Sequence, residues 1–391
     1  MNDRDVPAVI LAAGEGRRLT PLTHRRPKPM LPVANRPLLE YVVSAIAEAG
    51  IDRVVMVVGH RQERIRTHFR DGDDWGVTIE YVDQSTRLGT AHAVSQVEDV
   101  VHGPFLVLNG DRIVDPSLIR DVRSTLLESG SPVVSVTPSK RPSEYGVIEL
   151  DGDRIVSIEE KPAAVSASAL INAGVYGFDA DIFRAIYETP QEDGELAITT
   201  TLASYVETGS ISTVRYRGTW LDVSHLWDLL YVTAATIEPK GRDGSFERTH
   251  ETATTAEDVV VGTNVRIGPN ATIDGATALG DNVTVGANAV VANSVVLADA
   301  VIEPGAIVRD AVVGESARIG PNTTLPGGSA SVVVEGEVFD DVEFGGVVGD
   351  TARVGGGVTI DPGTIVGDGV RIDHGVSVGG RLESETLVRR G

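Results

Sequence analysis

The 391-residue sequence contains no cysteine, few aromatic residues and only four lysines. Without cysteine it forms neither disulfides nor thiolate metal sites. No apolar run approaches the ~18 residues that a membrane-spanning helix needs, and the first residues lack the pattern of a signal peptide. We therefore expect a cytoplasmic protein without a membrane partner. Hydrophobic residues still make up 41% of the chain, enough to build the cores of two or three domains.

The charge balance is strongly acidic. Aspartate and glutamate number 56 against 34 lysines and arginines, giving a formal net charge of −22. Such a surface repels polynucleotides, so we expect no nucleic-acid partner. An acidic chain almost free of lysine also suggests a halophilic cytoplasm, in which salt screens the self-repulsion. A melting temperature that does not rise between low and molar salt would contradict that hypothesis.

The strongest local signal lies between Pro7 and Pro32, in PAVILAAGEGRRLTPLTHRRPKPMLP. Its apolar start predicts a buried strand, Ala8–Ala13. The two glycines that follow allow backbone N–H groups to approach an anion, and Arg18 and Lys28 add positive charge. Neither the P-loop pattern nor the dinucleotide fingerprint GxGxxG is present. The stretch therefore predicts a polyphosphate-binding loop of another kind.

Strands and helices then alternate along the chain. The predicted strands are Val54–Val58, Val77–Val82, Phe105–Leu108 and Val133–Val136, and the predicted helices are Pro37–Ala49, Gln62–Phe69, Ala91–Val97 and Pro116–Leu127. This alternation predicts a Rossmann-like α/β domain with a mainly parallel sheet. Ligands bind at the carboxyl ends of the strands in such sheets. Gly14, Gln84 and Asp111 each follow a predicted strand, so we expect them to converge on one crevice.

Shorter strands follow between residues 144 and 220, and Ser224–Thr236 predicts a further helix with Ser224 as its N-cap. After a polar segment, aliphatic residues recur every six positions. The runs are Val261, Ile267, Ile273, Leu279, Val285, Val291 and Leu297; Ile307, Val313, Ile319 and Leu325; and Val342, Val348, Val354, Ile360, Val366, Ile372 and Val378, with a break at Pro326–Asp341. This period predicts a parallel β-helix. We divide the chain into an α/β domain (1–237), a linker (238–255) and a β-helix domain (256–391).

The loop pattern G-x-G-x-R-L-x-P-x-T-x-x-x-P-K-P-M resembles the signature of the sugar-1-phosphate nucleotidylyltransferases, of the glucose-1-phosphate thymidylyl- and uridylyltransferase type. Arg17 departs from the family, which usually has Thr or Ser there. The remaining motifs of the family are matched, in chain order, by the segments around Gln84, Asp111, Gly146, Lys161, Asn172 and Asp222. The repeat resembles the left-handed β-helix that some of these enzymes carry, and its left hand rests on that resemblance alone.

The resemblance implies a role for each matching residue. The implied catalytic residues are Arg18, Lys28, Asp111, Lys161 and Asp222, of which Asp111 and Asp222 would hold Mg²⁺. The implied nucleotide contacts are Leu11, Ala13, Gly14, Gly16, Gln84 and Gly89, and the implied sugar contacts are Gly146, Glu160 and Asn172. Gln84 can offer both a donor and an acceptor to a pyrimidine edge, and Gly89 allows the backbone to approach the base.

The implied reaction joins an NTP and a sugar 1-phosphate to give an NDP-sugar and pyrophosphate. UTP or dTTP is favoured, with glucose 1-phosphate or N-acetylglucosamine 1-phosphate, although the sequence leaves both the base and the sugar open. One alternative is a catalytically silent regulatory or scaffolding subunit, which the presence of all five charged site residues disfavours. Another is a bifunctional enzyme whose β-helix also transfers acetyl groups from acetyl-CoA; His374 is the only histidine in the second half of the repeat. We expect the β-helix to drive homo-oligomerisation, with a trimer favoured, and to lack that acetyl transfer.

Overall fold

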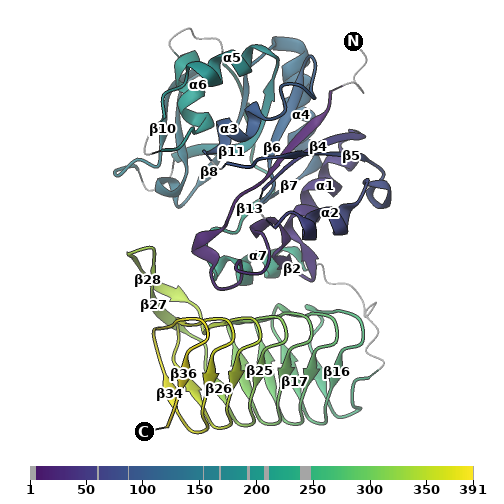
Figure 1. Cartoon of the computed structure of the whole chain (residues 1–391), viewed down its shortest axis with the longest axis vertical. Helices are drawn as coiled ribbons and strands as arrows, with labels where there is room; N and C mark the ends of the chain where they lie inside the picture. The colour runs from purple at the N-terminus through teal and green to yellow at the C-terminus, as the bar shows by residue number, and fades with distance from the viewer. Residues whose placement is uncertain are drawn as a thin grey trace. The chain divides into compact units, whose positions relative to one another are not determined.

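The computed structural model describes residues 6–59, 61–86, 88–152, 154–166, 169–191, 194–206, 211–237 and 248–390. The chain forms two compact units that interleave along the sequence (Figure 1). The first comprises Met1–Glu15, Pro27–Met30 and Leu38–Asp222, and the second Gly16–Arg26, Leu31–Pro37 and Val223–Gly391. Of the predicted linker, residues 238–247 lie outside the described part of the chain. Among the described residues, no helix has both the length and the hydropathy to cross a bilayer.

The first unit is built on a nine-stranded mixed sheet of order β10-β9-β11-β6-β1-β4-β5, with β8 paired to β11 and β12 to β8. The strands are β1 (Ala8–Ala12), β4 (Arg53–Val58), β5 (Thr78–Asp83), β6 (Phe105–Asn109), β8 (Val133–Ser139), β9 (Gly146–Asp151), β10 (Arg154–Glu160), β11 (Ala169–Phe178) and β12 (Ser212–Arg215). β6, β1, β4 and β5 are parallel neighbours, whereas β11 runs antiparallel to β6. The predicted α/β fold is therefore confirmed.

The direction of strand addition changes between β1 and β6. From β1 the chain adds β4 and β5 on one side, then returns to add β6 on the other. Ligands of open α/β sheets bind outside the carboxyl ends of the strands at such a switch point. Gly14 follows β1 and Asp111 follows β6, so both are placed at this position.

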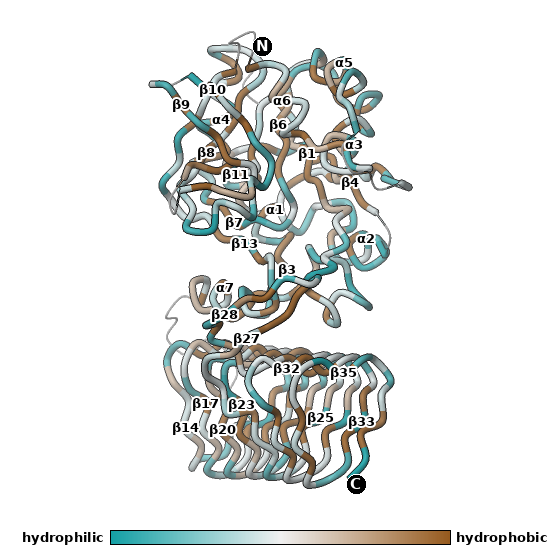
Figure 2. The backbone as a smooth tube through the Cα atoms, turned by 90° about the vertical axis from the view of Figure 1, so that its left-hand side faces the viewer, coloured by the Kyte–Doolittle hydropathy of each residue, from teal (hydrophilic) through white to brown (hydrophobic). Residues whose placement is uncertain are grey.

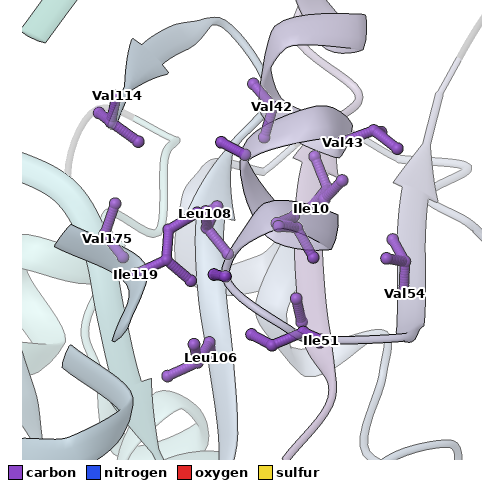
Figure 3. Close-up of a cluster of buried hydrophobic side chains, with 14 of the residues drawn as sticks. Ile10, Val42, Val43, Ile51, Val54, Leu106, Leu108, Val114, Ile119 and Val175 are labelled. Atoms are coloured by element: carbon purple, nitrogen blue, oxygen red, sulfur yellow. The ribbon is translucent and has the colours of Figure 1, made fainter. Parts of the chain in front are cut away.

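The helices of the first unit are α1 (Leu38–Glu48), α2 (Glu63–Phe69), α3 (Thr90–Ser95), α4 (Pro116–Ser129), α5 (Asp181–Glu188) and α6 (Ile198–Val206). The four predicted helices agree with α1 to α4 to within two residues at each end, whereas α5 and α6 were not predicted. Figure 3 shows α1 covering one face of the sheet, where Val42 and Val43 lie over Ile10 and Leu108. These side chains are at most 1% exposed and form the core on which the strand ends rest.

The second unit contains a parallel β-helix of three sheets, each of seven strands (Figure 1). One sheet holds β14 (Thr254–Thr255), β17 (Thr272–Asp274), β20 (Val290–Ala292), β23 (Ile307–Arg309), β26 (Thr324–Leu325), β31 (Thr359–Ile360) and β34 (Ser377–Val378). The second holds β15 (Val259–Val261), β18 (Thr277–Leu279), β21 (Val295–Val296), β24 (Ala311–Val313), β29 (Gly346–Val348), β32 (Thr364–Val366) and β35 (Arg381–Leu382). The third holds β16 (Arg266–Ile267), β19 (Thr284–Val285), β22 (Val301–Ile302), β25 (Arg318–Ile319), β30 (Arg353–Val354), β33 (Arg371–Ile372) and β36 (Leu387–Val388).

The β-helix confirms the hexapeptide interpretation and corrects three of its positions. The phase slip comes earlier than predicted, because Val296 lies opposite Leu279 and takes the interior position assigned to Leu297. Val308 likewise replaces Ile307 in the core. Figure 2 shows hydrophobic and hydrophilic segments alternating along each coil, as expected when one aliphatic residue per hexad points inward. The predicted break is a protruding hairpin of β27 (Ser329–Val334) and β28 (Glu337–Glu343), and Val342 belongs to it.

Helix α7 (Asp228–Thr236) begins four residues later than predicted. The backbone N–H groups of Ser224 and His225 both donate to the Asp228 carboxylate, at 2.9 and 2.8 Å. Ser224 is therefore not the N-cap, because the carboxylate organises the preceding turn instead. Trp227 stacks on His225 at 4.6 Å between ring centroids and packs near Phe339 of the hairpin, so this turn is fastened to the β-helix within the second unit.

Part of the predicted polyphosphate loop belongs to the second unit. Arg26 is 3% exposed, and its guanidinium Nη2 lies 2.7 Å from an Asp350 carboxylate oxygen and 2.8 Å from Glu315. His24 lies 2.9 Å from Asp368. The segment Gly16–Arg26 is thus held to the late coils of the β-helix by acidic side chains, one of which, Asp350, is only 1% exposed.

Candidate active site

Two carboxylates and one lysine meet at the end of β6. Asp111 follows this strand, and Asp222 ends β13 (Trp220–Asp222), which pairs with β7 (Arg112–Val114) so that Asp222 lies opposite Arg112. The Lys28 ammonium nitrogen is 2.5 Å from Asp111 Oδ2 and 3.9 Å from Asp222 Oδ1. The side chain of Asp222 is 3% exposed, and that of Asp111 is 25% exposed. The group is therefore accessible to solvent on the side of Asp111 and buried on the side of Asp222.

The two carboxylates of this group stabilise the positive charge of Lys28. Burial lowers the pKa of Lys28, but the charges of Asp111 and Asp222 outweigh burial and raise the pKa above its usual value. The lysine therefore stays protonated. The described residues contain no cluster of three or more His, Cys, Asp or Glu side chains with metal-binding geometry. The pair of hard carboxylate donors nevertheless fits Mg²⁺, which takes one or two carboxylates and completes its shell with phosphate and water oxygens.

Tyr145 and Arg112 also belong to this group, although sequence analysis assigned neither a role. The Tyr145 hydroxyl donates to Asp222 Oδ2 at 2.9 Å. Burial, followed by the charge of Asp222, raises the pKa of Tyr145, so its hydroxyl keeps its proton. The Arg112 guanidinium lies 5.1 Å from the Tyr145 ring centroid and 4.9 Å from that of Trp220. The available signal was its position directly after Asp111.

Two of the predicted sugar contacts, Gly146 and Glu160, lie on β9 and β10, and the predicted catalytic residue Lys161 directly follows β10. Gly146 and Glu160 are opposite each other across the two strands. A Cβ atom on Gly146 would lie 2.8 Å from Thr199 Cγ2 and 3.0 Å from Glu160 Oε2, so a larger residue would displace these side chains. The Thr199 hydroxyl donates to Glu160 at 2.9 Å. Lys161 has a positive φ of 42°, and its ammonium group lies 3.8 Å from Glu160 and is about half exposed.

Asn172 is fixed in β11 at the side of this group. Its amide nitrogen donates to the Tyr176 hydroxyl at 2.5 Å, and its amide oxygen accepts from Gly174 N–H at 3.0 Å. Burial raises the pKa of Tyr176 to about 12. Asn172 Cβ lies 3.7 Å from the position that a Cβ on Gly146 would occupy. The structure therefore brings Gly146, Glu160 and Asn172 together.

The nucleotide contacts predicted in the first unit lie at the end of β1, just after it, and after β5. Leu11 accepts a hydrogen bond from Gly110 N–H at 3.0 Å, which ties the end of β1 to the end of β6. Ala13 is buried, whereas a Cβ on Gly14 would meet nothing within 4 Å. Open space beside this glycine leaves its backbone accessible to a ligand.

Gln84 is buried at the end of β5, and its amide nitrogen lies 2.9 Å from His92 Nδ1. Burial lowers the pKa of His92, which favours the neutral ring that accepts this hydrogen bond. Gly89 has a φ of 102°, and a Cβ there would lie 2.5 Å from the Leu196 carbonyl oxygen. His92 thus orients the Gln84 amide, and Gly89 is required by the backbone packed against it.

Gly16 and Arg18 belong to the second unit. Gly16 has a positive φ of 67°, and its carbonyl accepts from the Thr23 hydroxyl at 2.9 Å. Arg18 Nε lies 3.2 Å from Glu335, at the turn of the β27–β28 hairpin. The structure therefore gives Arg18 a carboxylate partner that the sequence did not predict.

An open α/β sheet with paired carboxylates and a lysine at its switch point is an arrangement that suits the binding of a phosphorylated ligand. Residues 7–238 match the model of the nucleotidyl transferase family, and the chain belongs to that family. Residues 255–344 also match the model described as the GMPPB C-terminal domain. The predicted resemblance to sugar-1-phosphate nucleotidyltransferases is thereby confirmed.

Curated relatives and solved structures agree with this family. The chain is 37% identical over 226 residues to the bifunctional protein GlmU of Methanococcus maripaludis, covering 57% of this chain and 52% of the relative. It is 35% identical over 240 residues to the low-salt glycan biosynthesis nucleotidyltransferase Agl11 of Haloferax volcanii, covering 59% and 66%. A crystal structure of a putative glucose-1-phosphate thymidylyltransferase from Bacillus anthracis superposes with a TM-score of 0.55 at 28% identity, covering 62% of this chain and 97% of that one. The chain spans about half the length of the GlmU relatives that it matches.

Proposed function

We propose that this protein joins an NTP to a sugar 1-phosphate and releases pyrophosphate. In this reaction an oxygen of the sugar phosphate attacks the α-phosphorus in line, and the bond from that phosphorus to the β-phosphate oxygen breaks. Catalysis of such transfers depends on positioning and on neutralising charge. The observation that carries the proposal is the group of Lys28, Asp111 and Asp222, joined through Tyr145 to the segment beginning at Gly146.

Each residue receives a role from its position. Asp111 and Asp222 would hold Mg²⁺, and a divalent cation bound there would neutralise charge on the α-phosphate. Lys28 would contact the triphosphate, and the family resemblance implies the same role for Arg18, whose partner within the second unit is Glu335. Lys161, whose ammonium group is about half exposed, would pair with the sugar phosphate and aim the nucleophile. Its backbone N–H donates to the Tyr145 carbonyl at 3.1 Å, which holds the two groups of residues in register.

Gln84 would recognise the nucleotide base through a hydrogen-bond donor on that base. Its amide nitrogen is directed to His92 Nδ1, which leaves its carbonyl oxygen to accept from the base. The ring N–H of uracil or thymine supplies such a donor. We therefore propose UTP or dTTP as the nucleotide, and glucose 1-phosphate or N-acetylglucosamine 1-phosphate as the sugar. We also propose the cytoplasm as the location of this reaction.

A substrate panel tests this function. Five nucleoside triphosphates (UTP, dTTP, CTP, ATP and GTP) are each combined with the 1-phosphates of glucose, N-acetylglucosamine and mannose, and pyrophosphate is measured. We expect release that requires both substrates and is fastest with UTP or dTTP. The proposal would be refuted if the folded protein, in Mg²⁺ and molar salt, released no pyrophosphate with any of the substrate pairs.

A further inference from the structure

Arg112 is a half-buried cation placed against the proposed metal ligands. It directly follows Asp111 in the chain and lies opposite Asp222 across β7 and β13. Its Nε is 3.9 Å from Asp111 Oδ1, and its side chain is 15% exposed. Asp111 and Asp222 together carry two negative charges, and Lys28 and Arg112 together carry two positive charges. The four side chains are therefore neutral as a group before any ligand arrives.

Several contacts keep the Arg112 guanidinium in place. It lies against the rings of both Tyr145 and Trp220, at 5.1 and 4.9 Å from their centroids, and these two rings contact each other edge to face. The Tyr145 ring is fixed by its hydrogen bond to Asp222, and the Trp220 indole N–H donates to the Ala173 carbonyl at 2.9 Å. Guanidinium groups stack favourably on aromatic faces, so this charge is held in a fixed position.

The backbone also makes room for the arginine. Gly174 has a φ of 81°, and a Cβ there would lie 3.2 Å from Arg112 Cδ. Arg112 Nη1 donates to the Asn172 carbonyl at 3.5 Å. Lys28 differs, because its ammonium group is the end of a flexible chain that can move to a phosphate when one binds. Arg112 is therefore the permanent cation of the group and Lys28 the exchangeable one.

We propose that Arg112 makes the Asp111–Asp222 pair discriminate against a free divalent cation and accept it as the metal–nucleotide complex. A free dication is attracted by the two carboxylates but repelled by Lys28 and Arg112. A metal–triphosphate complex carries net negative charge, so the same cations attract it. The Lys28 ammonium nitrogen lies within 3.9 Å of both carboxylates, so Lys28 would have to move for Asp111 and Asp222 to hold a divalent cation. This inference rests on the proposed function, since it assumes that an NTP is a substrate.

The effect of Arg112 on the affinity for a free divalent cation comes from its one fixed positive charge. A like charge within ~4–6 Å commonly changes the binding of a proton by ~1–3 pKa units, or ~10-fold or more. Binding of a dication beside the same carboxylates responds in the same direction. Removing the Arg112 charge should therefore tighten the binding of free metal by about tenfold, although it also removes an interaction that holds Tyr145 and Trp220. A purely structural role would weaken metal binding or leave it unchanged.

Mn²⁺ binding followed by electron paramagnetic resonance tests the proposal without turnover. The full-length protein is titrated with Mn²⁺, alone and with α,β-methylene UTP, and the Mn²⁺ held by the analogue in protein-free solution is subtracted. We expect the wild-type protein to bind Mn²⁺ weakly alone and at least tenfold more tightly with the analogue. Arg112→Gln should bind Mn²⁺ about tenfold more tightly than wild type in the absence of nucleotide. Arg112→Lys, which keeps the charge, should resemble wild type.

Three results would overturn the proposal. The first is an Arg112→Gln variant with native circular dichroism that binds free Mn²⁺ no more tightly than wild type. The second is an equal change in the Gln and Lys variants, which would assign the effect to shape. The third needs no variant: wild-type protein that binds Mn²⁺ as tightly without the analogue as with it. Failure of the proposed function is seen separately, as an absence of pyrophosphate release in the substrate panel.

Discussion

Breaking the ion pair between Arg26 and Asp350 would measure how much this contact, which holds the predicted polyphosphate loop to the β-helix, stabilises the second unit. The two side chains are 3% and 1% exposed, and their closest atoms are 2.7 Å apart. Arg26→Met removes one charge and leaves the other buried without its main counter-charge. Breaking a buried pair in this way typically costs ~3–5 kcal/mol, and we expect the second unit to lose stability in that range.

The partners of Asp350 set the controls. Its Oδ1 accepts the Glu315 backbone N–H at 2.8 Å, and an asparagine would keep that hydrogen bond. The double variant Arg26→Met/Asp350→Asn removes both charges, so it should recover most of the loss. Arg381→Met is the exposed control, because Arg381 is 43% exposed and donates to Thr20 at 3.1 Å. This change should cost less than ~1 kcal/mol.

The loss of stability in the Arg26→Met variant should also depend on pH. Burial raises the pKa of Asp350, while the Arg26 charge opposes that rise. Without Arg26 the folded-state pKa moves further above the unfolded value. The folded state then binds the proton more tightly than the unfolded state, so its destabilisation is fully present above the folded pKa. It is relieved as the pH falls through that pKa. The difference from wild type should therefore shrink on going from neutral to mildly acidic pH.

Tryptophan fluorescence during urea unfolding can follow the second unit alone. Of the three tryptophans, Trp227 lies in the second unit, whereas Trp75 and Trp220 lie in the first. Replacing Trp75 and Trp220 with phenylalanine leaves the Trp227 ring, stacked on His225, as the reporter. An Arg26→Met variant that unfolds at the same urea concentration as its parent would refute the buried-pair argument.

Four further predictions concern the proposed reaction and assembly. Asp111→Asn and Asp222→Asn should each lower turnover by about 10²-fold or more while the protein stays folded, because each removes a metal-binding charge; near-normal turnover in either would remove that residue from the site. Lys161→Ala should raise KM for the sugar 1-phosphate far more than KM for the NTP, with the exposed Lys140→Ala as control, and equal effects would contradict its role. Gln84→Ala should erase a preference for UTP or dTTP in the panel, whereas a wild-type preference for GTP would exclude the base assignment. Light scattering at molar salt should find a trimer, and a monomer would contradict the proposed role of the β-helix in assembly. A separate assay should find no consumption of acetyl-CoA with glucosamine 1-phosphate, and measurable consumption would contradict the expected lack of acetyl transfer.

Sequence patterns predicted the elements that local hydrophobicity determines. The continuous apolar runs of β1 and β6 identify strands buried on both faces, and the six-residue period identifies the coils of the β-helix. The same approach misplaced Val342, because an aliphatic residue in phase with the repeat looks the same in a hairpin as in a coil. The predicted start of α7 at Ser224 was wrong, because the Asp228 carboxylate accepts the backbone N–H groups of Ser224 and His225 and so organises a turn before the helix begins.

The parts of the site that sequence could not predict depend on long-range contacts. The short strands β7 and β13 are separated by more than a hundred residues, and only their pairing shows that Arg112 lies opposite Asp222. The Arg18–Glu335 contact likewise joins positions that no local pattern connects. Motif resemblance could name Asp111 and Asp222 individually, but the neutral balance of the group became visible only with Lys28 and Arg112 beside them.

The fate of labelled phosphate tests the central claim most directly. The protein is supplied with a sugar 1-phosphate and with UTP or dTTP labelled with ³²P at either the α- or the γ-position, and the products are separated. If the group around Asp111 and Asp222 directs attack on the α-phosphorus, the α-label appears in the NDP-sugar and the γ-label in pyrophosphate, both in amounts that depend on the sugar phosphate. Transfer of the γ-label to the sugar phosphate, or release of both labels without any NDP-sugar, would contradict the account.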